Sequence, residues 1–71
     1  MGAKTEIANH IRRLRFDHGE MSQEELARRA GVTRQTTIAL EAGEYAPSLL
    51  VAFKIAGVFG AGIEDVFEQP G

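Results

Sequence analysis

Residues 23–42 read QEELARRAGVTRQTTIALEA, and this stretch decides the fold that we expect. It holds two short helical patterns separated only by Gly31, Val32 and Thr33. A connection this tight forces its two helices to cross steeply. Ala27, four residues before Gly31, supplies the small side chain that a close crossing needs, and Gly31 can adopt a positive φ angle at the turn. The stretch therefore predicts two helices packed at a steep angle.

Both helices have start and stop signals. The first begins at Ser22, where a capping box lets the Ser22 hydroxyl accept the amide of Glu25 and the Glu25 carboxylate reach back to the Ser22 amide. Gly31 stops this helix. The second begins at Thr33, a good N-cap, and Gly43 stops it. Each helix is therefore about two to three turns long.

Gly and Pro divide the rest of the chain into three further helical patterns, over about 5–17, 48–59 and 63–68. No stretch alternates in the manner of a strand. In the first pattern the inward face is expected to hold Ile7, Ile11 and Leu14, and in the second Leu49, Ala52, Ile55, Ala56 and Phe59. The sequence predicts an all-α fold of five helices.

The size and composition allow one small domain, over residues 1–71 with its core in 5–68. No stretch reaches the ~20 apolar residues of a membrane-spanning helix, and the N-terminus lacks a secretion signal. The chain has no cysteine, which excludes thiolate metal sites and fits a reducing cytoplasm. His10 and His18 lie beside no carboxylate cluster. We therefore expect no metal, no cofactor and no enzyme activity.

The net charge of −2 argues against a nucleic-acid ligand, but the charges are unevenly distributed. Residues 1–43 hold seven basic and six acidic residues, a balance of +1. Residues 44–71 hold one lysine against four acids, a balance of −3. If the acidic end points away from a nucleic acid, the net charge does not exclude such a ligand.

The outer face of the helix that follows Thr33 carries Arg34, Gln35 and Ile38. Arginine is the commonest bidentate partner of guanine, glutamine can pair with adenine, and an apolar tip can meet the methyl group of thymine. Thr33 and the free amides of the helix start can donate to a phosphate. This pattern is typical of a helix that enters the major groove of DNA.

The stretch from Gln23 to Gly43, with YAPSL at 45–49, AFKIAGVFG at 52–60 and IEDVF at 63–67, resembles the phage-repressor (Cro-like, or Xre) helix-turn-helix family. The resemblance covers about residues 7–67. It implies a five-helix, λ-repressor-like DNA-binding domain and a short stand-alone regulator without an effector domain.

By matching position, the resemblance implies that Arg34, Gln35 and Ile38 read bases. It implies phosphate contacts for Gln23, which also steadies the recognition helix, for Thr33 and for the loop that includes Tyr45. It further implies that Arg15 and Glu41 tie the first helix to the third. We add Thr36 and Arg28 as candidate phosphate contacts.

Structural alternatives stay open at several of these positions. Arg34 and Gln35 are also compatible with an ordinary solvated helix face. Arg28 and its neighbour Arg29 follow two glutamates at i,i+4 spacing, so pairs that stabilise the helix are the alternative to phosphate contact. Ile38 is either a base contact or a core residue that compensates for Thr37.

The sequence departs from the family pattern at three places. Thr37 stands where the family has Ile or Val on the buried side of the recognition helix, and its hydroxyl needs a carbonyl one turn earlier as partner. The substitution costs about 1 kcal/mol. Leu50 and Gly57 stand where the family often has charged or polar residues.

We expect a homodimer, because two recognition helices about 34 Å apart can read a palindromic operator. Phe53, Val66 and Phe67 are the candidate dimer residues. The expected function is regulation of transcription, most simply repression by occupancy of the operator. The alternative is an antitoxin-like protein whose acidic end binds a basic partner protein.

Overall fold

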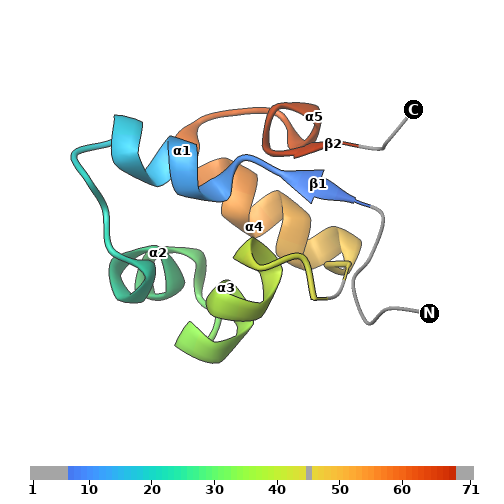
Figure 1. Ribbon diagram of the computed structural model, residues 1–71, viewed down its shortest axis with the longest axis horizontal. Coiled ribbons are helices and arrows are strands. Elements are labelled where there is room, and N and C mark those ends of the chain that lie inside the picture. The colour runs from blue at the N-terminus through green and yellow to red at the C-terminus, as the bar shows by residue number, and fades with distance from the viewer. Residues whose placement is uncertain (1–6, 45, 69–71) are drawn as a thin grey trace.

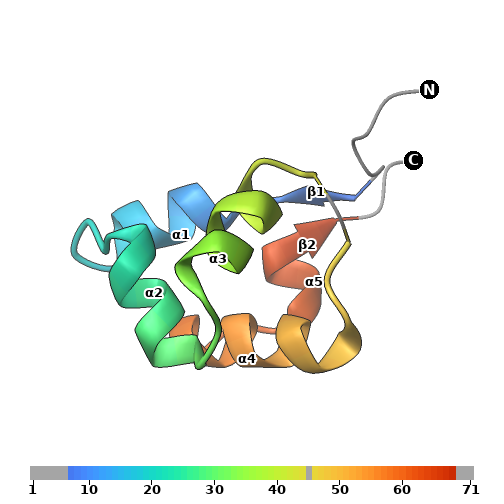
Figure 2. The same cartoon turned by 90° about the horizontal axis from the view of Figure 1, so that it is seen from below.

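The computed structural model describes residues 7–44 and 46–68, which form five helices and a two-stranded ribbon (Figure 1). The elements are, in chain order, β1 (Ala8–Asn9), α1 (Ile11–Asp17), α2 (Gln23–Ala30), α3 (Arg34–Glu41), α4 (Leu49–Phe59), α5 (Ile63–Val66) and β2 (Phe67–Glu68). The helices pack around one core, and α2 contacts both α3 and α4 (Figure 2). The predicted small all-α helix-turn-helix fold is confirmed.

The corner between α2 and α3 has the predicted geometry. Gly31 has a φ of +72°, and the amide of Val32 donates to the carbonyl of Ala27 at 3.0 Å, which closes the end of α2. The Thr33 hydroxyl accepts the amide of Thr36 at 3.0 Å and caps the start of α3. Local hydrogen bonds thus end one helix and start the next within three residues.

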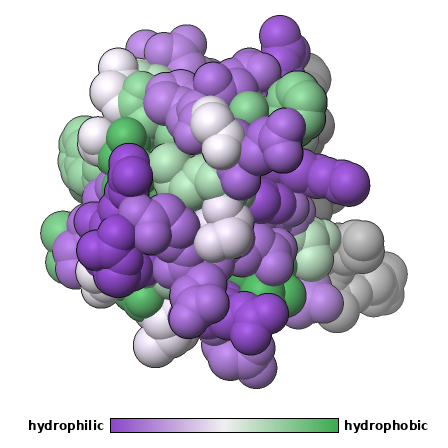
Figure 3. Space-filling view, turned by 90° about the vertical axis from the view of Figure 1, so that its left-hand side faces the viewer, coloured by the Kyte–Doolittle hydropathy of each residue, from purple (hydrophilic) through white to green (hydrophobic). Residues whose placement is uncertain are grey.

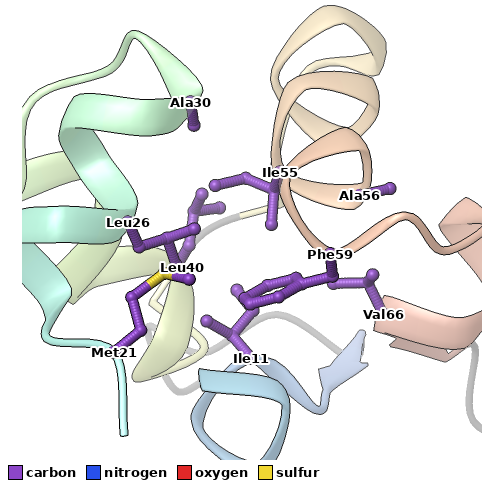
Figure 4. Packing of buried hydrophobic residues seen from close by; sticks show 9 residues of the cluster. All are labelled: Ile11, Met21, Leu26, Ala30, Leu40, Ile55, Ala56, Phe59 and Val66. Atoms are coloured by element: carbon purple, nitrogen blue, oxygen red, sulfur yellow. The ribbon is translucent and has the colours of Figure 1, made fainter. Parts of the chain in front are cut away.

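The core combines side chains from all five helices (Figure 4). Its members are Ile11, Met21, Leu26, Ala30, Leu40, Ile55, Ala56, Phe59 and Val66. Because α2 and α3 bury Leu26 and Leu40 in this cluster, the opposite side of α3 is left facing outward. None of the described helices is long and apolar enough to cross a membrane.

The two ends of the described chain differ from the expected helices. The predicted helix over 5–17 starts only at Ile11, and the helix predicted over 63–68 stops at Val66. Ala8 pairs with Glu68, and Asn9 with Phe67, in an antiparallel ribbon. Local periodicity cannot reveal such a pairing, because its hydrogen bonds join residues about sixty positions apart in the chain. Residues 5 and 6 lie outside the described residues.

The predicted inward face of α4 is correct except at its start. Ala52, Ile55, Ala56 and Phe59 are buried, whereas Leu49 is 69% exposed. Leu49 lies in the first turn of α4, at the edge of the molecule, beside an open apolar pocket. The core does not extend far enough along α4 to cover its first turn.

Arg15 and Glu41 tie α1 to the end of α3, as the resemblance implies. The guanidinium donates from Nε to Oε1 at 3.1 Å and from Nη2 to Oε2 at 2.8 Å, while Nη1 donates to the Met21 carbonyl at 2.7 Å. Gln23 adds a bond from Nε2 to Glu41 Oε1 at 3.3 Å. The charged side chains are only 16% and 13% exposed. Their bidentate geometry fixes both distance and orientation.

Thr37 occupies the buried side of α3 and is fully buried. Its hydroxyl donates to the Thr33 carbonyl one turn earlier, which is the partner that we expected. The distance of 3.4 Å is long for a bond between two oxygens, which is usually ~2.7 Å. The hydroxyl therefore recovers only part of the solvation that it loses on burial.

We predict that Glu41→Ala lowers the free energy of unfolding by about 2 kcal/mol, because it removes the acceptor of two charged hydrogen bonds. Urea denaturation measures the change. Glu24→Ala, at an exposed glutamate of α2, is the control and should change stability by less than ~0.5 kcal/mol. A Glu41→Ala protein as stable as the control would contradict the prediction.

We predict that Thr37→Val raises the free energy of unfolding by about 0.5–1 kcal/mol, since it replaces a poorly bonded buried hydroxyl by a methyl group. Thr36→Val, made at a half-buried position, should give no gain because it removes the acceptor of the Thr33 hydroxyl. Thermal unfolding of both variants distinguishes them. A loss of stability in Thr37→Val would show that the long bond is worth more than its length suggests.

Candidate nucleic-acid interface

The outward side of α3 begins with its first two residues, Arg34 and Gln35, which are both exposed. The opposite side of the same helix is held in the core by Thr37 and Leu40. Seen from below, α3 lies at the front of the molecule, with α2 beside it (Figure 2). The two side chains predicted to read bases therefore stand together at one exposed end of a fixed helix.

Ile38 and Thr36 lie between the two sides of α3 and are half-buried. Thr37 itself fills the core position, so Ile38 has not replaced it there. The Thr36 hydroxyl accepts the Thr33 hydroxyl at 2.9 Å, which makes Thr33 and Thr36 a linked pair at the start of α3. Base contact by Ile38 and phosphate contact by either threonine stay predictions.

Gln23, the first residue of α2, is half-buried beside the end of α3. Its bond to Glu41 is the steadying contact that the resemblance implies. The same side chain lies at the start of a helix, where backbone amides without helical partners favour an anion. A phosphate contact for Gln23 remains a prediction.

Arg28 and Arg29 both bind Glu25. One half of the predicted capping box is confirmed, because the Ser22 hydroxyl accepts the Glu25 amide at 3.0 Å. The other half is not, because the Glu25 carboxylate turns toward the arginines and not back to the Ser22 amide. Hydrogen bonds from Arg28, and then from Arg29, lower the pKa of Glu25 to about 2. The same contact raises the pKa of Arg28. Of the two predicted pairs, Glu25 with Arg29 has the expected spacing, whereas Arg28 pairs at i,i+3.

Glu25, Arg28 and Arg29 together carry one net positive charge on the exposed side of α2. Arg28 has a side chain that is 71% exposed, so its guanidinium remains accessible while it is paired. Figure 3 shows that the face of the molecule at the α1–α2 end is mostly hydrophilic, with hydrophobic side chains in small separate groups. Arg28 thus forms a pair with a glutamate that stabilises the helix, which was the alternative to phosphate contact. Because it is also exposed, it remains a candidate phosphate contact.

Three of the four acids in residues 44–71 lie away from α3, whereas Glu44 is exposed just after the end of that helix. In Figure 1, α5 and β2 are at the top of the molecule and α3 is at the bottom. Glu64, Asp65 and Glu68 are all exposed on these elements. The placement of these three acids weakens the objection from net charge, because salt screens the repulsion between exposed charges that are far apart. Tyr45, the predicted phosphate contact after Gly43, lies outside the described residues.

The candidate dimer residues have three different environments. Phe53 is 58% exposed on α4, Phe67 is half-buried against the core, and Val66 is fully buried. The expectation for Val66 is wrong, because the side chain fills the core beneath α5 and cannot reach a second copy. Sequence reasoning missed Leu49 and Leu50 as exposed apolar neighbours of Phe53. The apolar residue at position 50, where the family often has a polar one, was the available signal.

A second residue missed from the sequence is Asn9. Its side-chain amide donates to the carbonyl of Leu40 at 2.9 Å, although the two residues are 31 positions apart. An asparagine near a helix start is ordinarily interpreted as a local cap. No signal in the sequence pointed from Asn9 to the recognition helix.

Comparison with known proteins identifies the family. A helix-turn-helix family model, of the Xre/Cro-like kind, matches residues 11–66. An uncharacterized HTH-type transcriptional regulator of Archaeoglobus fulgidus is 56% identical over 61 residues, which cover 86% of each chain. Similar regulators of Methanocaldococcus jannaschii and Bacillus subtilis are 52% and 51% identical over 61 residues, covering 86% of this chain and 91% of theirs. These names indicate a transcriptional regulator. The chain belongs to the Xre/Cro-like helix-turn-helix family of transcriptional regulators, with a DNA-binding domain built on α2 and α3.

Proposed function

We propose that this regulator binds a palindromic operator as a homodimer, with α3 of each copy in the major groove. The observation that carries the proposal is the exposure of Arg34 and Gln35 at the start of a helix whose other side is buried and whose last residue is clamped by Arg15. A fixed helix with free guanidinium and amide groups at its leading end suits bidentate base recognition.

Each side chain has a role that follows from its chemistry. Arg34 binds O6 and N7 of guanine, Gln35 binds N6 and N7 of adenine, and Ile38 contacts a thymine methyl group. The phosphates of the DNA backbone are contacted by Gln23, Thr33, Thr36, Tyr45 and Arg28. The amides at the start of α2 and α3 support these contacts.

A second copy is needed because one helix of eight residues contacts too few base pairs for selectivity. The exposed apolar side chains at the start of α4, namely Leu49, Leu50 and Phe53, form the surface that we assign to the dimer contact. Phe67 lines the apolar pocket next to Leu49 and would lie at the edge of this contact. Exposed apolar side chains grouped in this way favour association with another surface.

Occupancy of the operator would block polymerase, so repression is the simplest outcome. We take residues 1–71 as one DNA-binding domain with its core in 5–68, and we place its action in the cytoplasm, where the operator would be. No cofactor enters this mechanism.

A second candidate function is binding of a basic partner protein in the manner of an antitoxin. The exposed acids Glu64, Asp65 and Glu68, gathered on α5 and β2, favour it. The two functions differ in their surfaces, since α3 carries the first and α5 the second. Variants of α3 therefore separate them.

We predict that Arg34→Ala and Gln35→Ala each weaken operator binding by about 1–3 kcal/mol and relax selectivity at one base pair. The operator is first selected from a random duplex pool, and affinities are then measured by fluorescence anisotropy at several salt concentrations. Arg12→Ala, which removes the same charge from an exposed position on α1, is the matched control and should leave selectivity unchanged.

Two outcomes would contradict the proposal, one for DNA binding and one for the residues that read bases. Affinity for random duplex should fall steeply with salt, because neutralised phosphates release counterions. A wild-type protein that binds no duplex at ~50 mM salt would contradict DNA binding. Full selectivity in both α3 variants would contradict the assigned reading residues.

We predict that Phe53→Glu converts the dimer to a monomer, because a buried charge at the contact costs several kcal/mol. Sedimentation equilibrium measures the mass. Phe16→Glu is the matched control, since Phe16 is a similarly exposed phenylalanine on α1, 66% against 58%. An unchanged dimer in Phe53→Glu would place the contact elsewhere, and a wild-type protein that is monomeric at all concentrations would refute the homodimer.

A further inference from the structure

Asn9 joins three parts of the molecule. Its Nδ2 donates to the Leu40 carbonyl at 2.9 Å and reaches the Glu41 carbonyl at 3.4 Å, both at the end of α3. Its Oδ1 accepts the amide of Ile11 at 3.2 Å, at the start of α1. Its main chain pairs with Phe67 in the ribbon. One half-buried residue thus connects the ribbon, α1 and α3.

The end of α3 is a place where such a connection has a mechanical effect. The last four carbonyls of a helix have no partner within it. The amides that follow α3 serve three of them: Ala42 donates to Ile38, Glu44 to Ala39 and Gly43 to Leu40. Asn9 adds a donor from a distant part of the chain to the last two carbonyls. Its N–H dipole also opposes the partial negative charge at the helix end.

Asn9 acts on α3 differently from the other groups that hold it. Arg15 and Gln23 bind the carboxylate of Glu41, a side chain with rotatable bonds of its own. Asn9 binds the main chain of the helix and therefore restrains the direction of its axis. Asn9 itself is restrained, because the ribbon pairs its residue with Phe67 and the amide of His10 donates to Val66 at 2.8 Å.

We propose that Asn9 is a positioning residue that fixes the orientation of α3, and with it the base selectivity of Arg34 and Gln35, without itself contacting DNA. The selectivity part rests on the proposed function. The proposed restraint of α3 does not depend on the proposed function, because it is argued from the hydrogen bonds of Asn9 alone.

Two variants separate this role from a local one. Asn9→Asp keeps an oxygen acceptor for the Ile11 amide but places a carboxylate, which has no donor, against the carbonyls of Leu40 and Glu41. Asn9→Ala loses both functions. A residue that only capped α1 would tolerate aspartate, whereas a residue that holds α3 would not. His10→Ala is the control, since His10 pairs with Glu68 on the neighbouring strand.

Amide hydrogen exchange and DNA binding are measured at a temperature at which circular dichroism shows every variant to be folded. We expect faster exchange at Ala42, Gly43 and Glu44 in Asn9→Asp and Asn9→Ala, and wild-type exchange in His10→Ala. The affinity ratio of operator to random duplex should fall about 3- to 30-fold in the two Asn9 variants. The salt slope of their affinity for random duplex should be unchanged, because no phosphate contact is lost. The affinity for random duplex should itself be unchanged in Asn9→Ala, which leaves the net charge as it is.

Wild-type exchange and selectivity in Asn9→Asp would overturn the proposal and reduce Asn9 to a local cap of α1. An equal loss of selectivity in His10→Ala would also overturn it, because the ribbon and not the amide would then be responsible. If the wild-type protein binds no DNA, the proposed function fails, and the exchange data alone decide: faster exchange supports the restraint of α3, and unchanged exchange refutes it.

Discussion

The carboxylate of Glu41, clamped between Arg15 and Gln23, is the contact on which the arrangement of the helix-turn-helix depends. It brings together the side of α1, the start of α2 and the end of α3. Because the two charged groups are mostly shielded from water and meet through two parallel hydrogen bonds, they specify a geometry and not merely an attraction. Asn9 adds a restraint on the main chain at the same end of α3.

Holding α3 at its far end leaves its near end available. The Thr33 cap and the Gly31 corner use short local hydrogen bonds at the start of α3. Arg34 and Gln35 stand on the first turn of this helix, exposed to solvent. Burial and ion pairing hold the last turn of α3 in place, whereas the first turn is exposed to water and accessible to a ligand. Because the helix itself is held in place, only the side chains of Arg34 and Gln35 have to become ordered when they bind.

Charge and apolar surface are separated in the same way. The acids of α5 and β2 lie on the opposite side from α3, where they repel the phosphate backbone least (Figure 1). The exposed leucines and Phe53 occupy the start of α4, outside the core. The proposed reading helix, the exposed apolar side chains of α4 and the acids of α5 and β2 therefore lie on different parts of the same small domain.

Local chemistry in the sequence determined the helix-turn-helix itself. Its signals act within one or two helical turns, so they can be recognised from the sequence. They are the caps at Ser22 and Thr33, the turn at Gly31 and the spacing of Leu26, Ala27 and Ala30. Tertiary structure alone decided the rest. It converted residues 8 and 9 into a strand, buried Val66, exposed Leu49 and aimed Asn9 at α3. Each of these outcomes depends on which distant segments meet, and a hydrogen bond across 31 or 58 residues leaves no periodic trace in the chain.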